Sequence, residues 1–352
     1  MSRNDAIAAA FAAQARHCDG YHSTLYGELC RRCADDVRAG GELATLTADW
    51  HGDPQRGSLP LRVLGGVHAL VLTGQAPHLG AFYPSAGGAP RWPDAWQAFV
   101  TTVQSHREPI RAWLPQPPQT NEVGRSGSLL GGFLHAAASG LPLRLLELGS
   151  SAGLNLRLDH YRITLGDRSF GPADARVVLR PAWTGPTPAA VPLRIASRAG
   201  CDLAPVDVRD PAARLRLQAY VWPDRTDRLA TLRAALAVAQ EVPVDLECAD
   251  AADWLERQLA VPSPGVATVV FHSSFHGYLP AATQQRLAAI LHAAGDRATA
   301  TAPVYWLRCE DEVPLPSDRA MQHEVRLRVW PGDAEHLLAR CQPHGDRVSW
   351  LA

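Results

Sequence analysis

From about residue 141 onward, the sequence alternates short apolar runs with helical segments, and this alternation constrains the fold most. The apolar runs are LRLLELG, VPLRIAS, VPVDLEC, VATVVFHS and APVYWLR. Runs of this kind are typical of parallel strands that are buried on both faces. The helical segments that separate most of them are 211–219, 225–240, 251–259 and 281–294. The pattern therefore predicts an open α/β sheet, and HEVRLRVWP and DRVSWL predict an antiparallel pair that closes it.

The first part of the chain has a different pattern. Apolar residues recur at helical spacing in four segments, which are 5–17, 22–39, 61–72 and 94–113. Links rich in Pro and Gly separate these segments, as expected of connections between helices. We therefore expect an all-helical N-terminal domain at 1–118 and an α/β domain at 119–352. Residues 162–190 are rich in Gly and Pro and are interpreted as an insertion in the second domain.

The composition argues against several classes of protein. The formal net charge is −1, which gives no general attraction to nucleic acid, and no apolar run approaches the ~20 residues of a membrane span. The N-terminal segment predicts an amphipathic helix rather than a signal peptide, so we expect a cytoplasmic protein without a membrane partner. The seven Cys residues are scattered, and Cys30-x-x-Cys33 has no second pair. We therefore expect neither a disulfide framework nor a metal site.

The stretch LLELGSSAGLNLRLDHY contains two signatures with different chemical meanings. Gly149, Ser151 and Gly153 spell G-x-S-x-G, in which Ser151 would be the nucleophile of a serine hydrolase. Asp250 and His272 follow in the chain order Ser, Asp, His that such a triad needs.

The same stretch also spells E-x-G-x-x-x-G through Glu147, Gly149 and Gly153, a strand-to-helix turn that cradles a nucleotide-type cofactor. The preceding residues are predicted to be helical, which makes this strand the first of its sheet. A nucleophile turn follows a middle strand instead, so we favour the cofactor loop.

In open α/β sheets, ligands lie beyond the carboxyl ends of the strands. Two later predicted strands end in chemically capable residues. ECADAADWL ends one strand with Asp250, and VVFHSSFHGYL ends the next with His272, Ser273, His276 and Tyr278. Because His is a natural base near neutral pH, the two His residues are candidate catalytic groups, although each could equally be a buried structural residue. Tyr278 is a further catalytic candidate, and Ser273 is a candidate for substrate binding.

Two further sets of polar residues are candidates for binding. Glu147 at a strand end is expected to line the cofactor pocket, and Asn155 either holds the loop backbone or contacts the ligand. A polar cluster precedes the first strand and consists of Gln119, Asn121, Glu122 and Arg125. This cluster could bind the substrate or the amino-acid end of a cofactor, with Arg125 as a carboxylate clamp, or it could be a helix cap with surface charge.

The loop and the strand ends resemble the class I S-adenosylmethionine-dependent methyltransferases over roughly residues 119–352. LLELGSSAG resembles their first motif, with Ser151 where a glycine is usual, and CADAADWL resembles the segment after their third strand. FHSSFHGYL lies where their fourth strand supplies catalytic residues. The resemblance implies a Rossmann-like sheet, mostly parallel with an antiparallel last strand, that binds S-adenosylmethionine. It also implies that Asp250 accepts from the adenine amino group and that Ala251 offers its backbone.

The same resemblance requires an acid on the ribose hydroxyls at the end of the second strand. Asp202 in IASRAGCDLAPVD is our choice, because a helical segment and the third strand follow it. Asp167 has the better spacing from Gly149 but lies in the predicted insertion. Both assignments stay open at the level of the sequence.

A second resemblance spans nearly the whole chain. PPQTNEVGRS, ELGSSAGLNL, SRAGCDLAPVD and YVWPDRTDRL look like an uncharacterised bacterial family, the domain-of-unknown-function family numbered 2332. This family brings no established reaction. Our leading hypothesis is a methyltransferase that acts on a small-molecule acceptor by in-line displacement. The alternatives are a non-catalytic sensor of a nucleotide-like ligand and a serine hydrolase that uses Ser151.

Overall fold

A computed structural model describes residues 2–311 and 323–352 of the chain. It divides into two compact units, one formed by Met1–Thr120 with Arg209–Arg233 and the other by Asn121–Val208 with Ala234–Ala352. The sequence placed a boundary at 118/119 but gave no sign that a later segment returns to the first unit.

The first unit contains helices throughout its described length. They are α1 (Arg3–Gly20), α2 (Thr24–Arg38), α3 (Glu42–Leu46), α4 (Leu59–Leu72), α5 (Pro77–Gly80), α6 (Asp94–Ser105), α7 (Arg107–Arg111) and α9 (Pro211–Ala219), with the short 3₁₀ helix η1 (Pro84–Ala86). Helix α10 (Thr226–Glu241) gives its first half to this unit and its second half to the other. Apolar faces of the longer helices bury a common core in which Phe11, Leu29 and Phe99 are fully inaccessible.

Specific polar contacts explain why the later segment belongs to the first unit. The Asp224 carboxylate accepts hydrogen bonds from the Ser23 hydroxyl at 2.6 Å and from the Leu25 N–H at 3.0 Å, at the start of α2. The buried His68 ring on α4 donates from Nδ1 to the carbonyl of Ala219 at 3.0 Å. These contacts join residues some 150–200 positions apart, and no local pattern in the sequence encodes them.

The second unit is built on a mixed sheet. In the described part of the chain it has nine strands in the order β5-β12-β11-β10-β9-β8-β1-β6-β7. The strands are β1 (Leu143–Leu148), β5 (Ala182–Thr184), β6 (Ile195–Asp202), β7 (Asp245–Cys248), β8 (Ala267–Ser273), β9 (Val304–Glu310), β10 (His323–Trp330), β11 (Ala334–Cys341) and β12 (Arg347–Trp350). The five from β7 to β9 are parallel neighbours, and they coincide with the five apolar runs. The prediction of an α/β protein with a mostly parallel sheet is confirmed.

The end of the sheet differs from the prediction. Strand β11 lies between β10 and β12 and pairs antiparallel with both, so the expected direct pairing of HEVRLRVWP with DRVSWL is wrong. A tight turn through Gly332 (φ +111°) and Asp333 (φ +51°) returns the chain from β10 into β11. The first residues of β11 are exposed, so the segment lacks the apolar run by which the buried strands were found.

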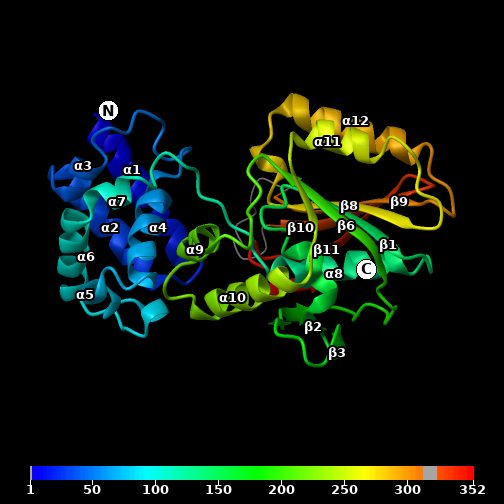
Figure 1. Ribbon diagram of the computed structural model, residues 1–352, viewed down its shortest axis with the longest axis horizontal. Helices are drawn as coiled ribbons and strands as arrows, with labels where there is room; N and C mark the ends of the chain where they lie inside the picture. Colours follow the sequence, from blue (N-terminus) through cyan, green and yellow to red (C-terminus); the bar gives the residue numbers. More distant parts are fainter. Residues whose placement is uncertain (1, 312–322) are drawn as a thin grey trace. The chain divides into compact units, whose positions relative to one another are not determined.

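Helices cover both faces of the sheet, as Figure 1 shows. Helix α8 (Arg125–Ala137) packs on one face, where the Phe133 and Phe271 rings meet edge to face at 5.0 Å. Helices α11 (Ala251–Gln258) and α12 (Ala281–Gly295) pack on the other face, where Trp254 and Leu291 join a core that includes Leu146.

The connection after β1 departs from a simple crossover. A kinked 3₁₀ helix, η2 (Asn155–His160), stands where the sequence predicted an α-helix. It leads into a small sheet of β2 (Arg162–Leu165), β3 (Arg168–Phe170) and β4 (Val178–Leu179). Strand β5 then pairs with β12 at the edge of the large sheet, so the predicted insertion supplies strands to both sheets.

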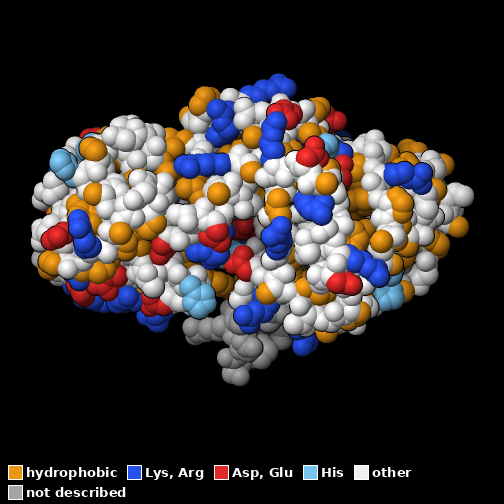
Figure 2. Space-filling view, turned by 90° about the horizontal axis from the view of Figure 1, so that it is seen from below, with side chains coloured by type: hydrophobic (Ala, Val, Ile, Leu, Met, Phe, Trp, Pro, Cys, Tyr) orange, Lys and Arg blue, Asp and Glu red, His pale blue; other side chains and the backbone are white. Residues whose placement is uncertain are grey.

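The surface agrees with the charge balance of the sequence. On the face shown in Figure 2, arginine and acidic side chains are interspersed. Among the helices of the described residues, none combines the length and the hydropathy that crossing a bilayer would require.

Candidate functional site

The loop after β1 has an unusual backbone. Gly149 (φ +66°), Ser151 (φ +50°) and Gly153 (φ +64°) all adopt left-handed conformations. Such a conformation costs a non-glycine residue such as Ser151 ~1–3 kcal/mol, so the surrounding structure must hold it. The Asp202 carboxylate does so, since its two oxygens accept from the Ser151 N–H and the Ala204 N–H, each at 2.9 Å. The end of β6 is thereby fixed to the loop.

Glu147 is the most unusual group near this loop. Its side chain is 3% exposed, and its Oε2 atom has no hydrogen-bond partner. Burial raises the pKa of the Glu147 carboxyl well above its ordinary value, while Arg157 and a hydrogen bond from Asn155 act in the opposite direction. The Ser151 hydroxyl is likewise buried without a partner. Because buried polar atoms are nearly always satisfied, two such atoms at one strand end suggest that a ligand or water completes the site.

Both predicted amides of this region hold the loop. The Asn121 Oδ1 atom accepts from the Leu154 N–H at 2.9 Å, and the Asn155 Oδ1 atom accepts from the Ser126 hydroxyl at 2.7 Å. These contacts attach the loop to the segment that begins α8. The Asn155 contact is with the Ser126 side chain rather than with the loop backbone, and the expected ligand contact stays a prediction.

Arg157 is a site residue that the sequence analysis missed. Its side chain is 2% exposed and donates four hydrogen bonds to backbone carbonyls. NH1 donates to Ala152 and Gly153 in the loop, while Nε and NH2 donate to Val242 and Ala239 at the end of α10. The signal in the sequence was only an arginine in an apolar helical stretch, and its partners are far from it along the chain.

Asp250 lies at the end of the next strand along the sheet edge. It caps α11, because its Oδ1 atom accepts from the N–H groups of Ala252 at 2.9 Å and Asp253 at 3.1 Å. The Ala249 N–H donates to the Asp202 carbonyl, which brings the ends of β6 and β7 together. Ala251 is the first residue of α11, so its N–H is one of the free groups at the helix start.

The two candidate acids for the ribose hydroxyls, Asp202 and Asp167, lie in different parts of the second unit. Asp202 contacts the loop directly, as described above. Asp167 lies in the turn between β2 and β3, where it is exposed and accepts from the Thr187 hydroxyl at 2.8 Å. Only Asp202 therefore lies at the carboxyl edge of the large sheet.

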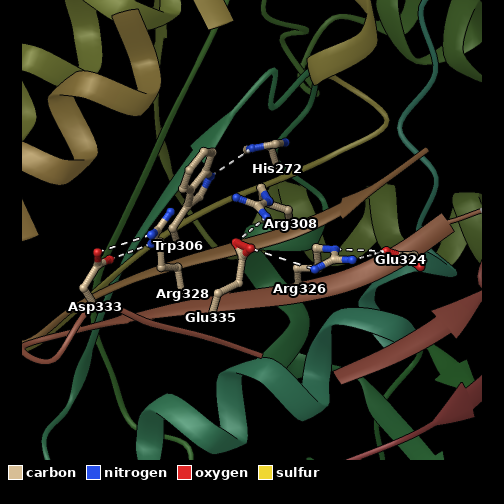
Figure 3. Close-up of polar contacts among 8 residues, drawn as sticks. All are labelled: His272, Trp306, Arg308, Glu324, Arg326, Arg328, Asp333 and Glu335. Atoms are coloured by element: carbon tan, nitrogen blue, oxygen red, sulfur yellow. Dashed lines mark hydrogen bonds and ion pairs between the residues drawn. The ribbon is translucent and has the colours of Figure 1, made fainter. Parts of the chain in front are cut away.

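His272 does not have the surroundings of a catalytic base. Its side chain is 1% exposed, and its Nε2 atom accepts from the indole N–H of Trp306 at 3.1 Å (Figure 3). An indole can only donate, so Nε2 is unprotonated and the Nδ1 atom donates to Glu310 at 2.6 Å. Both nitrogens are engaged inside the core, which matches the buried structural role that the sequence left open beside the catalytic one. Glu310 in turn accepts from the Phe275 N–H and fixes the turn after β8.

The other candidates after β8 are more accessible. The His276 ring stacks on the His272 ring at 5.8 Å and is half-buried. Burial lowers the pKa of His276, which favours its neutral ring. Tyr278 is 86% exposed and has little contact with the loop. The Ser273 carbonyl accepts from Arg125 at 3.2 Å, so this residue contributes its backbone.

Phe275 occupies the space next to the glycine loop. A methyl group built on Gly149 would lie 2.3 Å from the Phe275 ring. The close approach for which the glycine was singled out is therefore made by a side chain of the same protein.

The polar cluster before β1 is divided between the two units. Gln119 belongs to the first unit, whereas Asn121, Glu122 and Arg125 belong to the second. The Glu122 Oε1 atom accepts from the Gly124 N–H at 3.2 Å near the start of α8. Arg125 donates from Nε to the Pro343 carbonyl at 2.8 Å, and so connects α8 to the turn after β11.

Comparison with protein families places the chain in one of them. The model of a family described as "Uncharacterized protein conserved in bacteria (DUF2332)" matches residues 8–350. The chain belongs to this bacterial family. No curated protein and no solved structure matched the chain.

The DUF2332 chain does not assemble the hydrolase triad that its sequence suggested. Ser151 has no hydrogen-bond partner for its hydroxyl, Asp250 caps a helix, and His272 is bonded to Glu310 and Trp306. Among the residues that the structure describes, no three His, Cys, Asp or Glu side chains gather in a way that could hold a metal ion. With no triad and no metal cluster among the described residues, the candidate site consists of the glycine loop and the carboxylates near the ends of neighbouring strands.

Proposed function

We propose that the second unit binds S-adenosylmethionine at the carboxyl edge of its sheet and is a methyltransferase. The observation that supports this most strongly is the position of three carboxylates. Glu147 is the penultimate residue of β1, Asp202 is the last residue of β6, and Asp250 follows β7 by two residues. These three strands are neighbours in the sheet, and the left-handed loop starts directly after β1. A nucleoside with an amino-acid tail presents hydroxyls, an exocyclic amine and an ammonium, all of which donate to carboxylates.

The strand order supports the same edge. From β1 the chain passes to β6 and β7 on one side, and later to β8 and β9 on the other. The order therefore reverses between β1 and β8, and open α/β sheets bind their ligands at such a point. The Gly149 loop and the turn of Phe275 lie at this reversal.

The residues present fit the cofactor in their chemistry. The unsatisfied Glu147 Oε2 and Ser151 Oγ atoms would bind its polar groups. Asp202, whose oxygens each accept one backbone N–H, would accept a further hydrogen bond from hydroxyls. Asp250 is exposed, and the N–H groups of α11 bond its Oδ1 atom, so its second oxygen could serve a ligand. When bound, S-adenosylmethionine supplies an electrophilic methyl group. Binding also requires that the Phe275 ring move away from Gly149.

His276 is the residue that we assign to proton removal from the acceptor. Its neutral ring is half exposed beside the turn after β8, whereas His272 is occupied. A neutral imidazole near the reacting groups is a suitable general base. Catalysis that depends on it should fail at acidic pH, below the lowered pKa of His276.

Binding is tested by calorimetry and thermal shift with S-adenosylmethionine and S-adenosylhomocysteine. The informative variant is Asp250→Asn, because Asn caps helices as well as Asp does but cannot accept from an amine through two carboxylate oxygens. It should reduce the preference for S-adenosylhomocysteine over its inosine analogue, a preference worth ~1–3 kcal/mol or roughly 5- to 150-fold.

The matched control is Asp250→Ala, which removes the cap and should additionally lower the melting temperature. Failure of the wild-type protein to bind either compound at millimolar concentration would refute the proposal. Binding without methyl transfer to any acceptor would instead support a sensor.

A further inference from the structure

The second unit contains a cavity of about 210 Å³ that the proposed cofactor site does not use. It lies between α8 and the small sheet. Its walls include Leu130 and Leu134 of α8, Leu158 of η2, Tyr161, Ile163 of β2 and Phe170 of β3. None of these residues is assigned to the cofactor above.

The departure from a simple crossover explains why the cavity exists. After β1 the chain forms the short η2 and the small sheet instead of an α-helix that would pack against α8. Gly171 (φ +81°) lies close to the Tyr161 carbonyl beside the small sheet. The insertion and α8 together line the space.

The walls of the cavity indicate the chemistry of its occupant. Leu158, Tyr161 and Ile163 are at most 1% exposed. The Tyr161 hydroxyl is directed elsewhere, because it donates to the Leu154 carbonyl at 2.6 Å. Asp159 is the one charged residue in the wall, and Arg198 neutralises it through two hydrogen bonds of 2.9 and 3.0 Å. No charged wall residue remains to bind an ion.

The volume sets the size. Protein interiors contain few voids larger than a water molecule, and an apolar cavity of about 150 Å³ is large enough to bind benzene. We propose that this cavity is a binding site for a small uncharged apolar molecule, of the size of one substituted aromatic ring. The proposal rests on the cavity alone and is independent of the cofactor site.

The cavity wall is joined to the loop that follows β1. The Tyr161 hydroxyl bonds the Leu154 carbonyl, and Arg198 donates to both Asp159 and the Leu156 carbonyl. An occupant that contacts Leu158 and Tyr161 would therefore stabilise the segment directly after Gly153. Occupancy should raise the melting temperature and protect these amides from hydrogen exchange.

The test is a fluorine NMR titration of the full-length protein with fluorobenzene, together with thermal shift. Wild type should broaden the fluorobenzene signal saturably, and Leu134→Phe should weaken binding at least tenfold because the new ring fills the cavity. Leu287→Phe is the matched control: this leucine is equally buried but lies on α12, on the opposite face of the sheet, and should keep the wild-type affinity.

If Leu134→Phe does not fold, Leu134→Ala provides the test. Its enlarged cavity should bind naphthalene more tightly relative to fluorobenzene than the wild-type cavity does. Absence of saturable binding to wild type would overturn the proposal. So would equal affinity in folded Leu134→Phe, or an unchanged size preference in Leu134→Ala.

Discussion

Replacement of Arg157 by leucine should destabilise the second unit strongly. The guanidinium is 2% exposed and donates to four backbone carbonyls at 2.7, 2.8, 3.0 and 3.3 Å. Without it, the carbonyls of Ala152, Gly153, Ala239 and Val242 lose a donor in a place that water reaches poorly. A buried group left without its partner costs ~1–3 kcal/mol.

The four costs do not simply add. Replacement by leucine also removes the desolvation penalty of the buried guanidinium, and the neighbouring backbone can relax. The carbonyls left behind are neutral, each costs ~1–3 kcal/mol when unsatisfied, and with partial relaxation we expect Arg157→Leu to cost ~3–5 kcal/mol in total. Arg157→Lys keeps the charge but cannot reach both the loop and α10 with one ammonium group. It should lose an intermediate amount.

The assay is equilibrium unfolding in denaturant, followed by circular dichroism, with hydrogen exchange of residues 149–154 measured by mass spectrometry. Arg176→Leu is the control, because Arg176 pairs with Glu241 at 2.6 Å but both side chains are more than half exposed. Such a pair is worth ~0–1 kcal/mol. The reasoning is refuted if Arg157→Leu costs under ~1 kcal/mol or leaves exchange of the loop unchanged.

Three further predictions concern buried groups. Burial raises the pKa of Glu147, so ionisation destabilises the fold as pH rises above the ordinary value of 4.5, and Glu147→Gln should become increasingly more stable than wild type as the pH is raised above 4.5 in thermal melts. Burial lowers the pKa of His68 from 6.5 to about 4, so wild type should lose ~3 kcal/mol as pH falls through that window, and His68→Gln should flatten the loss. Gly149→Val should lower the melting temperature as well as abolish cofactor binding, because its Cβ would meet Phe275 at 2.3 Å and its φ is +66°.

The central strands could be predicted from the sequence because buried strands are rich in apolar residues. Strands covered on both faces are mostly apolar, and β1, β8 and β9 are almost wholly buried. Strand β11 begins exposed, so no continuous apolar run marks it. The segment after Asn155 looked helical, yet a residue with non-helical angles inside η2 breaks it at Arg157. That break is where the buried guanidinium reaches the loop carbonyls, a tertiary contact that overrides local preference.

The candidate site was predictable in its location rather than in its contacts. The strand ends named Glu147, Asp202 and Asp250, and all three do lie at one edge of the sheet. Which of their oxygens are already satisfied depends on backbone N–H groups from other loops. Asp202 uses one oxygen on the loop and the other on the turn after its own strand, Asp250 uses one on its helix, and Glu147 leaves one unused. Such a distribution follows from three-dimensional packing and has no signature in a single sequence.

The two histidines after β8 show how alternation along a strand separates structure from chemistry. His272 is still within the strand, so its side chain projects into the face on which Trp306 lies, and two neighbours satisfy its nitrogens. His276 lies beyond Ser274, whose φ of +45° turns the chain out of the sheet, and its ring is left half exposed. A separation of four positions along the chain thus places His272 in the core and His276 near the surface. A general base in this turn is therefore expected after the strand has ended, and His276→Gln, rather than His272→Gln, should abolish turnover without loss of fold.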